Sequence, residues 1–276
     1  MKVVPIDPDG IGAGTIVRRK RDGSFECVTD EVAVEEPLEI RLGNDPLAIT
    51  MRTPGNDEEL AAGFMLSEGL IRNRSELKKL EHSTLPKSLG NILDVSLAPD
   101  ANRKTSSMHR FGTISTSCGL CGKTSIDSIR QHFPPLASSL VRISVAQLLD
   151  LPDRLRSAQG NFDRTGGIHA AAIFDLQDNN VISREDVGRH NAVDKVIGRA
   201  LLDDLVPLHS HVLMVSGRSS LEIVQKALAA GIPIIASVSA PSSLAVNFAR
   251  ESGQTLIGFL RPPTFNVYSH VERLDT

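Results

Sequence analysis

The 276-residue sequence has no tryptophan, a single tyrosine and an aromatic content of only 4%. So few aromatic rings leave little surface on which nucleobases could stack. The formal net charge of −3 gives no general attraction to a phosphate backbone. Both features argue against a nucleic-acid-binding protein. The basic run RRKR at residues 18–21 is accordingly expected to be a solvated strand end.

Long apolar runs are also missing, since no segment approaches the roughly 18 apolar residues of a membrane span. The first ten residues, MKVVPIDPDG, lack the apolar core of a signal peptide. The three cysteines are too few, and odd in number, for a secreted disulfide framework, so their thiols should be reduced. The sequence therefore predicts a cytoplasmic protein with no membrane partner.

The first hundred residues are predicted to be β-rich with one helix. Residues 38–53 form two alternating apolar and polar runs around Gly43, which is the pattern of a hairpin. Residues 57–71 begin with acids and continue with spaced apolar residues, which indicates an amphipathic helix. Residues 91–97 (NILDVSL) indicate a further strand.

A polar stretch at residues 98–110 is the best candidate for a linker. We therefore expect a smaller, β-rich α+β domain at residues 1–106 and an α/β domain at residues 107–276. Strands and helices alternate in the second part, over residues 169–176, 181–186, 188–204, 211–217, 219–231, 232–239, 242–253 and 255–260. Its strands are apolar without alternation, as expected where helices cover both faces of a layered sheet.

Two junctions between a strand and a helix are rich in small hydroxyl residues: SGRSS at residues 216–220 and SAPSS at residues 239–243. In α/β sheets ligands bind at the carboxyl ends of strands, where free main-chain amides and an arginine suit a phosphate or another anion. The alternative is that these serines only cap their helices. Neither GxGxxG nor GxxxxGK occurs, so an ordinary dinucleotide or P-loop site is not indicated.

Two further segments, FDRTGGIH and REDVGRHNAVDK, concentrate polar residues and glycines. Paired glycines permit a close approach of the backbone to a neighbour or a ligand. Helix capping and ion pairs between neighbouring residues would explain several of the polar side chains without any ligand. We favour a functional interpretation, in which the ligand site includes Gly166, Gly167, His169, Arg189 and His190.

The remaining motif is CGLCG, which contains Cys118 and Cys121. A zinc site usually needs four ligands and this motif supplies two, although His109, His169 or His190 could complete the set. A thioredoxin-like redox pair should follow an early strand, yet nearly half of the chain precedes this one. The thiols could also be structural. Flanking glycines, a predicted helix start and the adjacent Lys123 favour exposed, partly ionised and nucleophilic thiols.

Five segments in order then resemble the FdhD family, the formate dehydrogenase accessory sulfurtransferases: CGLCG, TGGIHAAA, REDVGRHNAVDKVIG, SGRSSLEIVQKALAAGIPIIASVSAPSSLA and TLIGFLRPPTFNVYSH. They spread over about residues 110–270, with weaker matches in EEPLEIRLG and ELAAGFMLSEGLI. The family loop often reads Thr-Ser-Ser-Cys where this chain has Ser115-Thr116-Ser117 before Cys118, and the family's SAPT is SAPS here. Both changes keep hydroxyl groups.

The resemblance implies a C-terminal domain with the layered α/β fold of cytidine deaminases, and a smaller N-terminal domain. It implies a sulfurtransferase that takes sulfur from a cysteine desulfurase. We predict that Cys118 carries the persulfide and Cys121 assists, because the first cysteine of a CxxC that opens a helix is usually the more exposed and more acidic. The acceptor would be the bis(molybdopterin guanine dinucleotide) molybdenum cofactor of formate dehydrogenase, bound as a substrate. A homodimer is implied as well, and neither a permanent cofactor nor a metal ion is expected.

The terminal strand at residues 255–260 is expected to run into a loop, because consecutive prolines end sheet pairing. The resemblance implies that the guanine dinucleotide docks against this loop, with Arg218 and Ser219 holding phosphate and Asn266 reading the base. The complete set expected to bind the cofactor is Phe259, Leu260, Arg261, Pro262, Pro263, Thr264, Asn266, Gly217, Arg218, Ser219, Ser239, Ser242, Gly166, Gly167, His169, Arg189 and His190.

Other functions stay open at this point. A cofactor-binding chaperone would need no sulfur chemistry, and a zinc or dithiol enzyme would use the two cysteines differently. A deaminase is disfavoured, because its H-x-E motif precedes P-C-x-x-C, whereas GGIHAAA has no glutamate and follows the cysteines.

Overall fold

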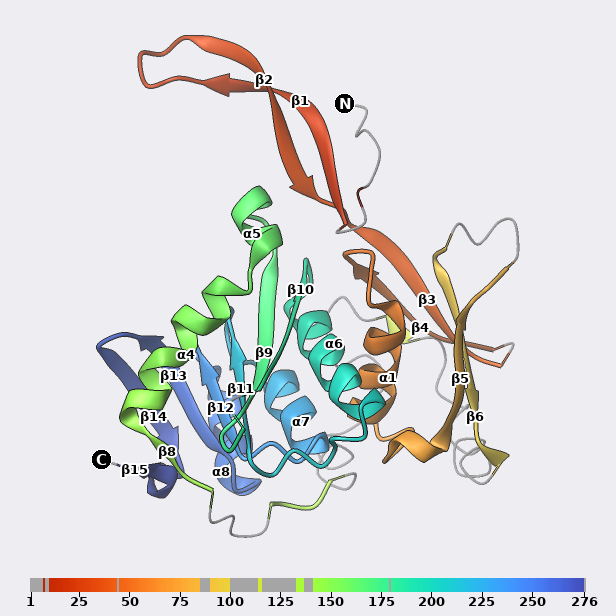
Figure 1. The fold of residues 1–276 in the computed structure, drawn as a ribbon, viewed down its shortest axis with the longest axis vertical. Coiled ribbons are helices and arrows are strands. Elements are labelled where there is room, and N and C mark those ends of the chain that lie inside the picture. Colours follow the sequence, from red (N-terminus) through yellow and green to blue (C-terminus); the bar gives the residue numbers. More distant parts are fainter. Residues whose placement is uncertain are drawn as a thin grey trace.

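The fold is described from a computed structural model, which covers residues 7, 10–43, 45–84, 90–99, 114–115, 133–136, 141–178 and 180–275. Figure 1 shows a large sheet flanked by helices, a second sheet beside it and a hairpin that projects from the body. The chain is thus a mixed α/β protein, as predicted. Among the described residues, no helix is both long and apolar enough to cross a membrane.

The large sheet has six strands in the order β10-β9-β11-β12-β13-β14. Its strands are β9 (His169–Asp175), β10 (Val181–Asp186), β11 (His211–Val215), β12 (Ile234–Ser237), β13 (Thr255–Arg261) and β14 (Thr264–Ser269). The central strands β11, β12 and β13 run parallel to one another, while β9, β10 and β14 complete antiparallel pairs. The predicted strand-turn-strand unit and the alternation after it are therefore confirmed.

Helices cover both faces of this sheet, as its uninterrupted apolar strands predict. On one face lies α4 (Val145–Ser157), with α5 (Gly160–Thr165) after it; the other face carries α6 (Arg189–Leu202), α7 (Leu221–Ala229) and α8 (Ser243–Glu251). The alternating side chains of β9 show the division. Ala170, Ala172 and Phe174 join the α4 side of the core, and Ala171 and Ile173 join the α6 side.

The second sheet has five strands in the order β5-β6-β3-β4-β7. These are β3 (Glu36–Leu42), β4 (Asp45–Arg52), β5 (Leu77–His82), β6 (Ile92–Leu97) and β7 (Ile114–Ser115). The predicted hairpin around Gly43 is confirmed, because β3 and β4 pair antiparallel across it. Short elements elsewhere are the 3-10 turns η1 (Arg74–Glu76) and η2 (Val271–Arg273) and the parallel pair β8 (Ile143–Ser144) and β15 (Leu274–Asp275).

The helix α1 (Asp57–Ser67) is buried on all sides, not amphipathic as its sequence suggests. It lies between the five-stranded sheet and the α6–α7 layer, and every residue except Glu58 is buried. Its acidic first turn is accommodated by arginines from other elements: Asp57 binds Arg52 at 3.0 Å, and Glu59 binds Arg184 at 2.6 Å. Arg184 lies 125 residues from Glu59 in the sequence, so no local pattern could reveal that pair.

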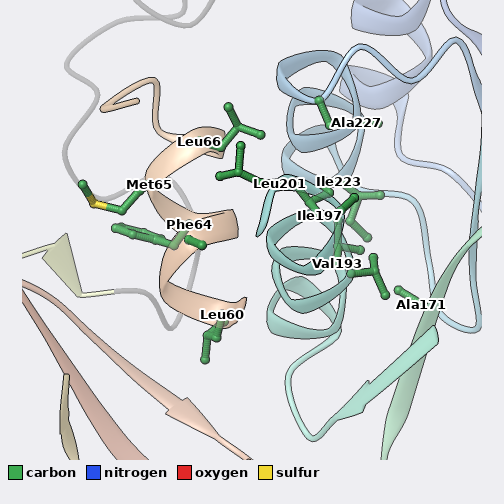
Figure 2. Close-up of a cluster of buried hydrophobic side chains, with 14 of the residues drawn as sticks. Leu60, Phe64, Met65, Leu66, Ala171, Val193, Ile197, Leu201, Ile223 and Ala227 are labelled. Carbon is green, nitrogen blue, oxygen red and sulfur yellow. The ribbon is translucent and has the colours of Figure 1, made fainter. Parts of the chain in front are cut away.

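One hydrophobic core joins the parts before and after residue 107 (Figure 2). Leu60, Phe64 and Leu66 of α1 contribute to the same buried cluster as Val193 and Ile197 of α6. The proposed domain boundary at residues 106 and 107 falls in a segment outside the described residues, and it stays a prediction. The helices α1 and α6 nevertheless form the main packed contact between the two halves of the chain.

The hairpin of β1 (Ile11–Arg19) and β2 (Phe25–Ala33) projects from the body (Figure 1). The run at residues 18–21 lies at its far end and is exposed, as expected of a solvated strand end. Arg164 of α5 ties its base to the body through Glu31 at 2.6 Å and Asp7 at 2.8 Å.

The C-terminal segment corrects one expectation. Pro262 and Pro263 do not end sheet pairing; they form the turn of a hairpin in which β14 returns alongside β13. The pairing of Arg261 with Thr264 closes this turn. Proline lacks an N–H group but is tolerated in a turn, where no ladder hydrogen bond is required of it.

Candidate functional site

Cys118 and Cys121 lie outside the described residues, and the other predicted site residues gather at one edge of the large sheet. The roles of the two cysteines therefore stay predictions. The third cysteine, Cys27, lies in β2, as predicted, and is exposed and free.

The two hydroxyl-rich junctions lie side by side at the carboxyl edge of the parallel strands. Ser219 forms an isolated parallel bridge with Pro241, and the amide of Ser242 donates to the carbonyl of Ser219 at 3.0 Å. The amide of Phe259, at the end of β13, donates to the carbonyl of Ser239 at 3.1 Å. The strands β11, β12 and β13 thus bring their following segments together, as their parallel order predicts.

Phe259 has an unusual backbone conformation at this edge. Its φ is 52°, in the left-handed region, and the pairing of β13 with β14 shifts register between Gly258 and Arg261. Its side chain is 42% exposed. Bulges of this kind re-aim side chains and are frequent beside functional sites. The bulge here turns an aromatic ring outward next to the SAPSS junction.

His169 and Arg189 approach the same edge from the other side. His169 begins β9, which runs antiparallel to β11, so it lies beside the end of β11. A Cβ atom on Gly217 would lie 3.4 Å from Nδ1 of His169 and 3.7 Å from Cδ of Arg189. Burial and the charge of Arg189 lower the pKa of His169, so its ring is neutral at physiological pH.

Two buried polar atoms at this edge have no hydrogen-bond partner among the described residues: Oγ of Ser219 and Nε of Arg189. Ser219 is completely buried. Buried polar atoms are nearly always paired, because an unpaired one costs about 1–3 kcal/mol. Both atoms can donate a hydrogen bond, so an anionic ligand would satisfy them. This pair identifies the edge as a candidate anion-binding site.

His190, at the start of α6, is fixed by two contacts. Its Nε2 lies 3.0 Å from Oγ of Ser220, and its Nδ1 lies 3.2 Å from Oε2 of Glu222. Burial, followed by the charges of Arg189 and Lys226, lowers the pKa of His190 to about 3. The ring is therefore neutral at physiological pH. The negative carboxylate beside Nδ1 favours the tautomer with the hydrogen on Nδ1, in which Nε2 accepts from Ser220.

This protonation state gives a first prediction. The ring signals of His190 should not titrate between pH 8 and pH 5 in NMR spectra, with assignment through a His190→Gln variant. In the unfolded chain the His190 ring has the ordinary pKa of 6.5. Between pH 6.5 and about 3 the ring therefore binds more protons in the unfolded chain than in the folded one. The contribution of His190 to the free energy of unfolding, taken as the difference from the His190→Gln variant, should thus fall as the pH is lowered through that window. A titration midpoint near pH 6 for the His190 ring in the folded protein would contradict the prediction.

Some polar residues around His190 make structural contacts, and others face the candidate site. Asp186 is fully buried and binds Lys195 at 2.7 Å, and Lys195 donates to the carbonyl of Thr53 at 2.9 Å. Asn191 donates to Asp186 at 3.0 Å and to the carbonyl of Met51 at 2.7 Å. These side chains tie α6 to the end of β4, so their role is structural, through contacts between elements rather than the expected capping and neighbouring ion pairs. Only Arg189 and His190 of this segment face the candidate site.

The remaining predicted residues differ in how exposed they are to a ligand. Leu260 is completely buried in the α4 side of the core, so it could meet a ligand only through its main chain. Arg261 is exposed and donates to the carbonyl of Val238 at 3.2 Å. Exposed side chains on the β13–β14 hairpin also include Pro262, Pro263, Thr264 and Asn266.

Gly166 and Gly167 lie just before β9 and are exposed. Gly166 ends α5 with a φ of 66°, a left-handed conformation that glycine adopts without steric cost. This explains Gly166 without a ligand. The sequence did not point to Glu222, since nothing local links it to a histidine on another helix.

The fold and this edge define an α/β protein with a candidate anion-binding site at the carboxyl ends of parallel strands. A sequence model of the FdhD/NarQ family matches residues 33–275. The chain therefore belongs to the FdhD/NarQ family.

Individual relatives agree with this assignment. The sulfur carrier protein FdhD of Streptomyces coelicolor is 50% identical over 264 residues, covering 94% of each chain. The sulfur carrier protein FdhD of Mycobacterium tuberculosis is 45% identical over 276 residues, covering 96% of this chain and all of that one. The crystal structure of a candidate formate dehydrogenase accessory protein from Desulfotalea psychrophila superposes with a TM-score of 0.74. It has 25% sequence identity and covers 95% of this chain and 98% of that chain.

Proposed function

We propose that this protein is a cytoplasmic sulfur carrier for the maturation of formate dehydrogenase. It accepts sulfur from a cysteine desulfurase as a persulfide and passes it to the bis(molybdopterin guanine dinucleotide) molybdenum cofactor, which it binds as a substrate. The sulfur-carrier names of its relatives and the CGLCG motif support the sulfur chemistry. The accessory-protein description of its structural neighbour supports the link to formate dehydrogenase.

The observation that carries the cofactor-binding part is the buried pair of Ser219 Oγ and Arg189 Nε, which have no hydrogen-bond partner within the described part of the chain. A diphosphate has acceptor oxygens for both atoms, and Arg189 supplies the positive charge. Gly217 leaves the edge open beside them, because it has no side chain. The exposed ring of Phe259 offers a surface on which a guanine base could stack. As the family resemblance implies, we further propose a homodimer and cytidine-deaminase-like layering of the large sheet and its helices.

Guanosine diphosphate is the simplest probe of this site. Arg189→Gln should weaken its binding by about 10- to 100-fold, since a charge-assisted hydrogen bond is worth roughly 1.5–3 kcal/mol. Arg218 is exposed, and solvent screens its charge, so Arg218→Ala should weaken binding by about tenfold at most. Isothermal titration calorimetry measures both constants.

The matched control is Arg250→Ala, near the opposite end of α8, where the side chain donates to the carbonyl of Tyr268. Its nucleotide affinity should equal that of the unchanged protein. An unchanged affinity in folded Arg189→Gln would remove that residue from the site. Persulfide loading of Cys118 should persist in all three variants, because loading requires no nucleotide.

A further inference from the structure

Ser220, His190 and Glu222 lie in a row at the candidate edge, with a hydrogen bond between Ser220 and His190 and a close polar contact between His190 and Glu222. The distances are 3.0 Å from Ser220 Oγ to His190 Nε2 and 3.2 Å from His190 Nδ1 to Glu222 Oε2. The side chains of His190 and Glu222 are 19% and 15% exposed. The order hydroxyl, imidazole and carboxylate is that of a nucleophile, its base and the group that orients the base.

The row extends into the core beyond Glu222. Nζ of Lys226 lies 3.5 Å from Oε1 of Glu222 and donates to Asp194 at 2.8 Å. Oγ of Ser67 donates to the same Asp194 at 2.9 Å. Glu222 is thus held between a buried ammonium and the imidazole, which keeps its Oε2 aimed at Nδ1. This support fixes the ring tautomer that leaves Nε2 free to accept a proton.

The start of α7 supplies free main-chain amides directly after Ser220. The residue directly precedes α7, and the first intrahelical bond runs from the amide of Val224 to the carbonyl of Ser220 at 3.3 Å. The amides before Val224 have no intrahelical acceptor, as in any helix. Nε of Arg189, the residue next to His190, has no partner in the ranges of the chain that the structure describes. Such donors can stabilise negative charge that develops on a substrate oxygen.

We propose that Ser220 is a nucleophile, with His190 as its base and Glu222 as the positioning residue, and that this triad hydrolyses carboxylic esters. Oγ attacks the carbonyl carbon while its proton passes to Nε2 of His190. The tetrahedral intermediate then expels the alkoxide, which takes that proton, and leaves an acyl-serine. Water then attacks the acyl carbon and gives a proton to Nε2 of His190, and His190 passes that proton to Oγ as the carboxylic acid leaves. The neighbouring Arg189 and Arg218 favour esters that carry an anionic group.

The environment of His190 sets the expected rate. Its weak basicity makes it a poorer proton acceptor than a base whose pKa lies near the working pH. Turnover should therefore be slow, and an irreversible probe is the sharper test. A fluorophosphonate should react with the full chain so that an Oγ–P bond forms, fluoride leaves and the proton passes to His190. Peptide mass spectrometry should locate the adduct on Ser220.

The variants separate the three roles. Ser220→Ala should abolish the adduct, and His190→Gln should slow labelling by about 100-fold, the low end of the range for general-base catalysis. Glu222→Asp, which keeps the charge, should label faster than Glu222→Gln. Hydrolysis of p-nitrophenyl acetate should fall in the same order. Each variant is first checked for an unchanged thermal unfolding midpoint.

A second serine–histidine–carboxylate group provides the matched control. Ser210 Oγ lies 3.4 Å from Nδ1 of His211, whose Nε2 is 3.6 Å from Asp175, which is too long for an aligned relay. Ser210 should stay unlabelled, and Ser210→Ala should leave labelling of Ser220 unchanged. No adduct on Ser220, or equal labelling in a folded His190→Gln protein, would overturn the triad. A Cys118→Ala protein should label normally, so this result is independent of sulfur transfer.

Discussion

Replacing Cys118 with alanine is expected to abolish persulfide formation and, with it, the activation of formate dehydrogenase. The first cysteine of a CxxC that opens a predicted helix is usually the more acidic, and its thiolate is the species that attacks a desulfurase persulfide. The unchanged protein, incubated with a cysteine desulfurase and L-cysteine, should gain one sulfur atom on the Cys118 peptide in mass spectrometry. The Cys118→Ala protein should gain none.

The second cysteine should affect release of sulfur rather than loading. The Cys121 thiolate can attack Sγ of the Cys118 persulfide, which forms a Cys118–Cys121 disulfide and expels hydrosulfide toward the acceptor. Cys121→Ala should therefore load normally but deliver poorly. Cys27→Ala is the matched control, because Cys27 lies exposed on the projecting hairpin and should be dispensable. A persulfide on Cys121 at full yield in the Cys118→Ala protein would contradict the assignment.

Two other chemistries of these cysteines give different results. A zinc enzyme would purify with stoichiometric metal that depends on both thiols, and a dithiol oxidoreductase would reduce insulin disulfides without a sulfur donor. A chaperone that only binds the cofactor would activate formate dehydrogenase with both cysteines replaced. Metal analysis after mild purification separates the first possibility from sulfur transfer before any activity is measured.

Local patterns in the sequence were enough to place the candidate edge. The apolar runs of β11, β12 and β13 predicted parallel strands, and parallel order alone brings the SGRSS and SAPSS junctions together. His169 and Arg189 were found because polar residues crowd two short segments. The structure then adds what no local pattern contains, namely which atoms of Ser219 and Arg189 are buried without a partner from the residues that the structure describes.

Contacts between different elements account for what the sequence did not reveal. The acids Asp57 and Glu59 suggested an exposed helix face, but Arg52 and Arg184 bind them in the interior. Pro262 and Pro263 suggested the end of the sheet, but a returning strand makes them a turn. In each case the deciding partner lies on another strand or across a turn, so apolar periodicity carries no trace of it.

Replacing Gly198 with alanine is expected to destabilise the fold strongly. A Cβ atom there would overlap the carbonyl oxygen of Glu59, and would lie 2.7 Å from the amide nitrogen of Gly63. On the facing helix, a Cβ on Gly63 would likewise overlap the carbonyl oxygen of Asp194 and lie 2.6 Å from its carbon. The backbones of α1 and α6 therefore touch, and backbone atoms cannot turn aside as a flexible side chain can. Alanine would push the two helices apart along the shared core of Figure 2.

The expected cost is about 3 kcal/mol or more, at the upper end for overpacked cores. That is a large part of the roughly 5–15 kcal/mol that stabilises a typical protein. At about 2–4 °C per kcal/mol for a chain of this size, the thermal unfolding midpoint should shift down by about 6–12 °C.

Gly160→Ala is the matched control, because nothing lies within 4 Å of its added Cβ, and it should unfold near the original temperature. The double variant Gly63→Ala/Gly198→Ala should lose less than the sum of the single losses, since helices already forced apart accept the second methyl group more easily. If Gly198→Ala unfolded at the same temperature as Gly160→Ala, the close packing of α1 against α6 would be refuted.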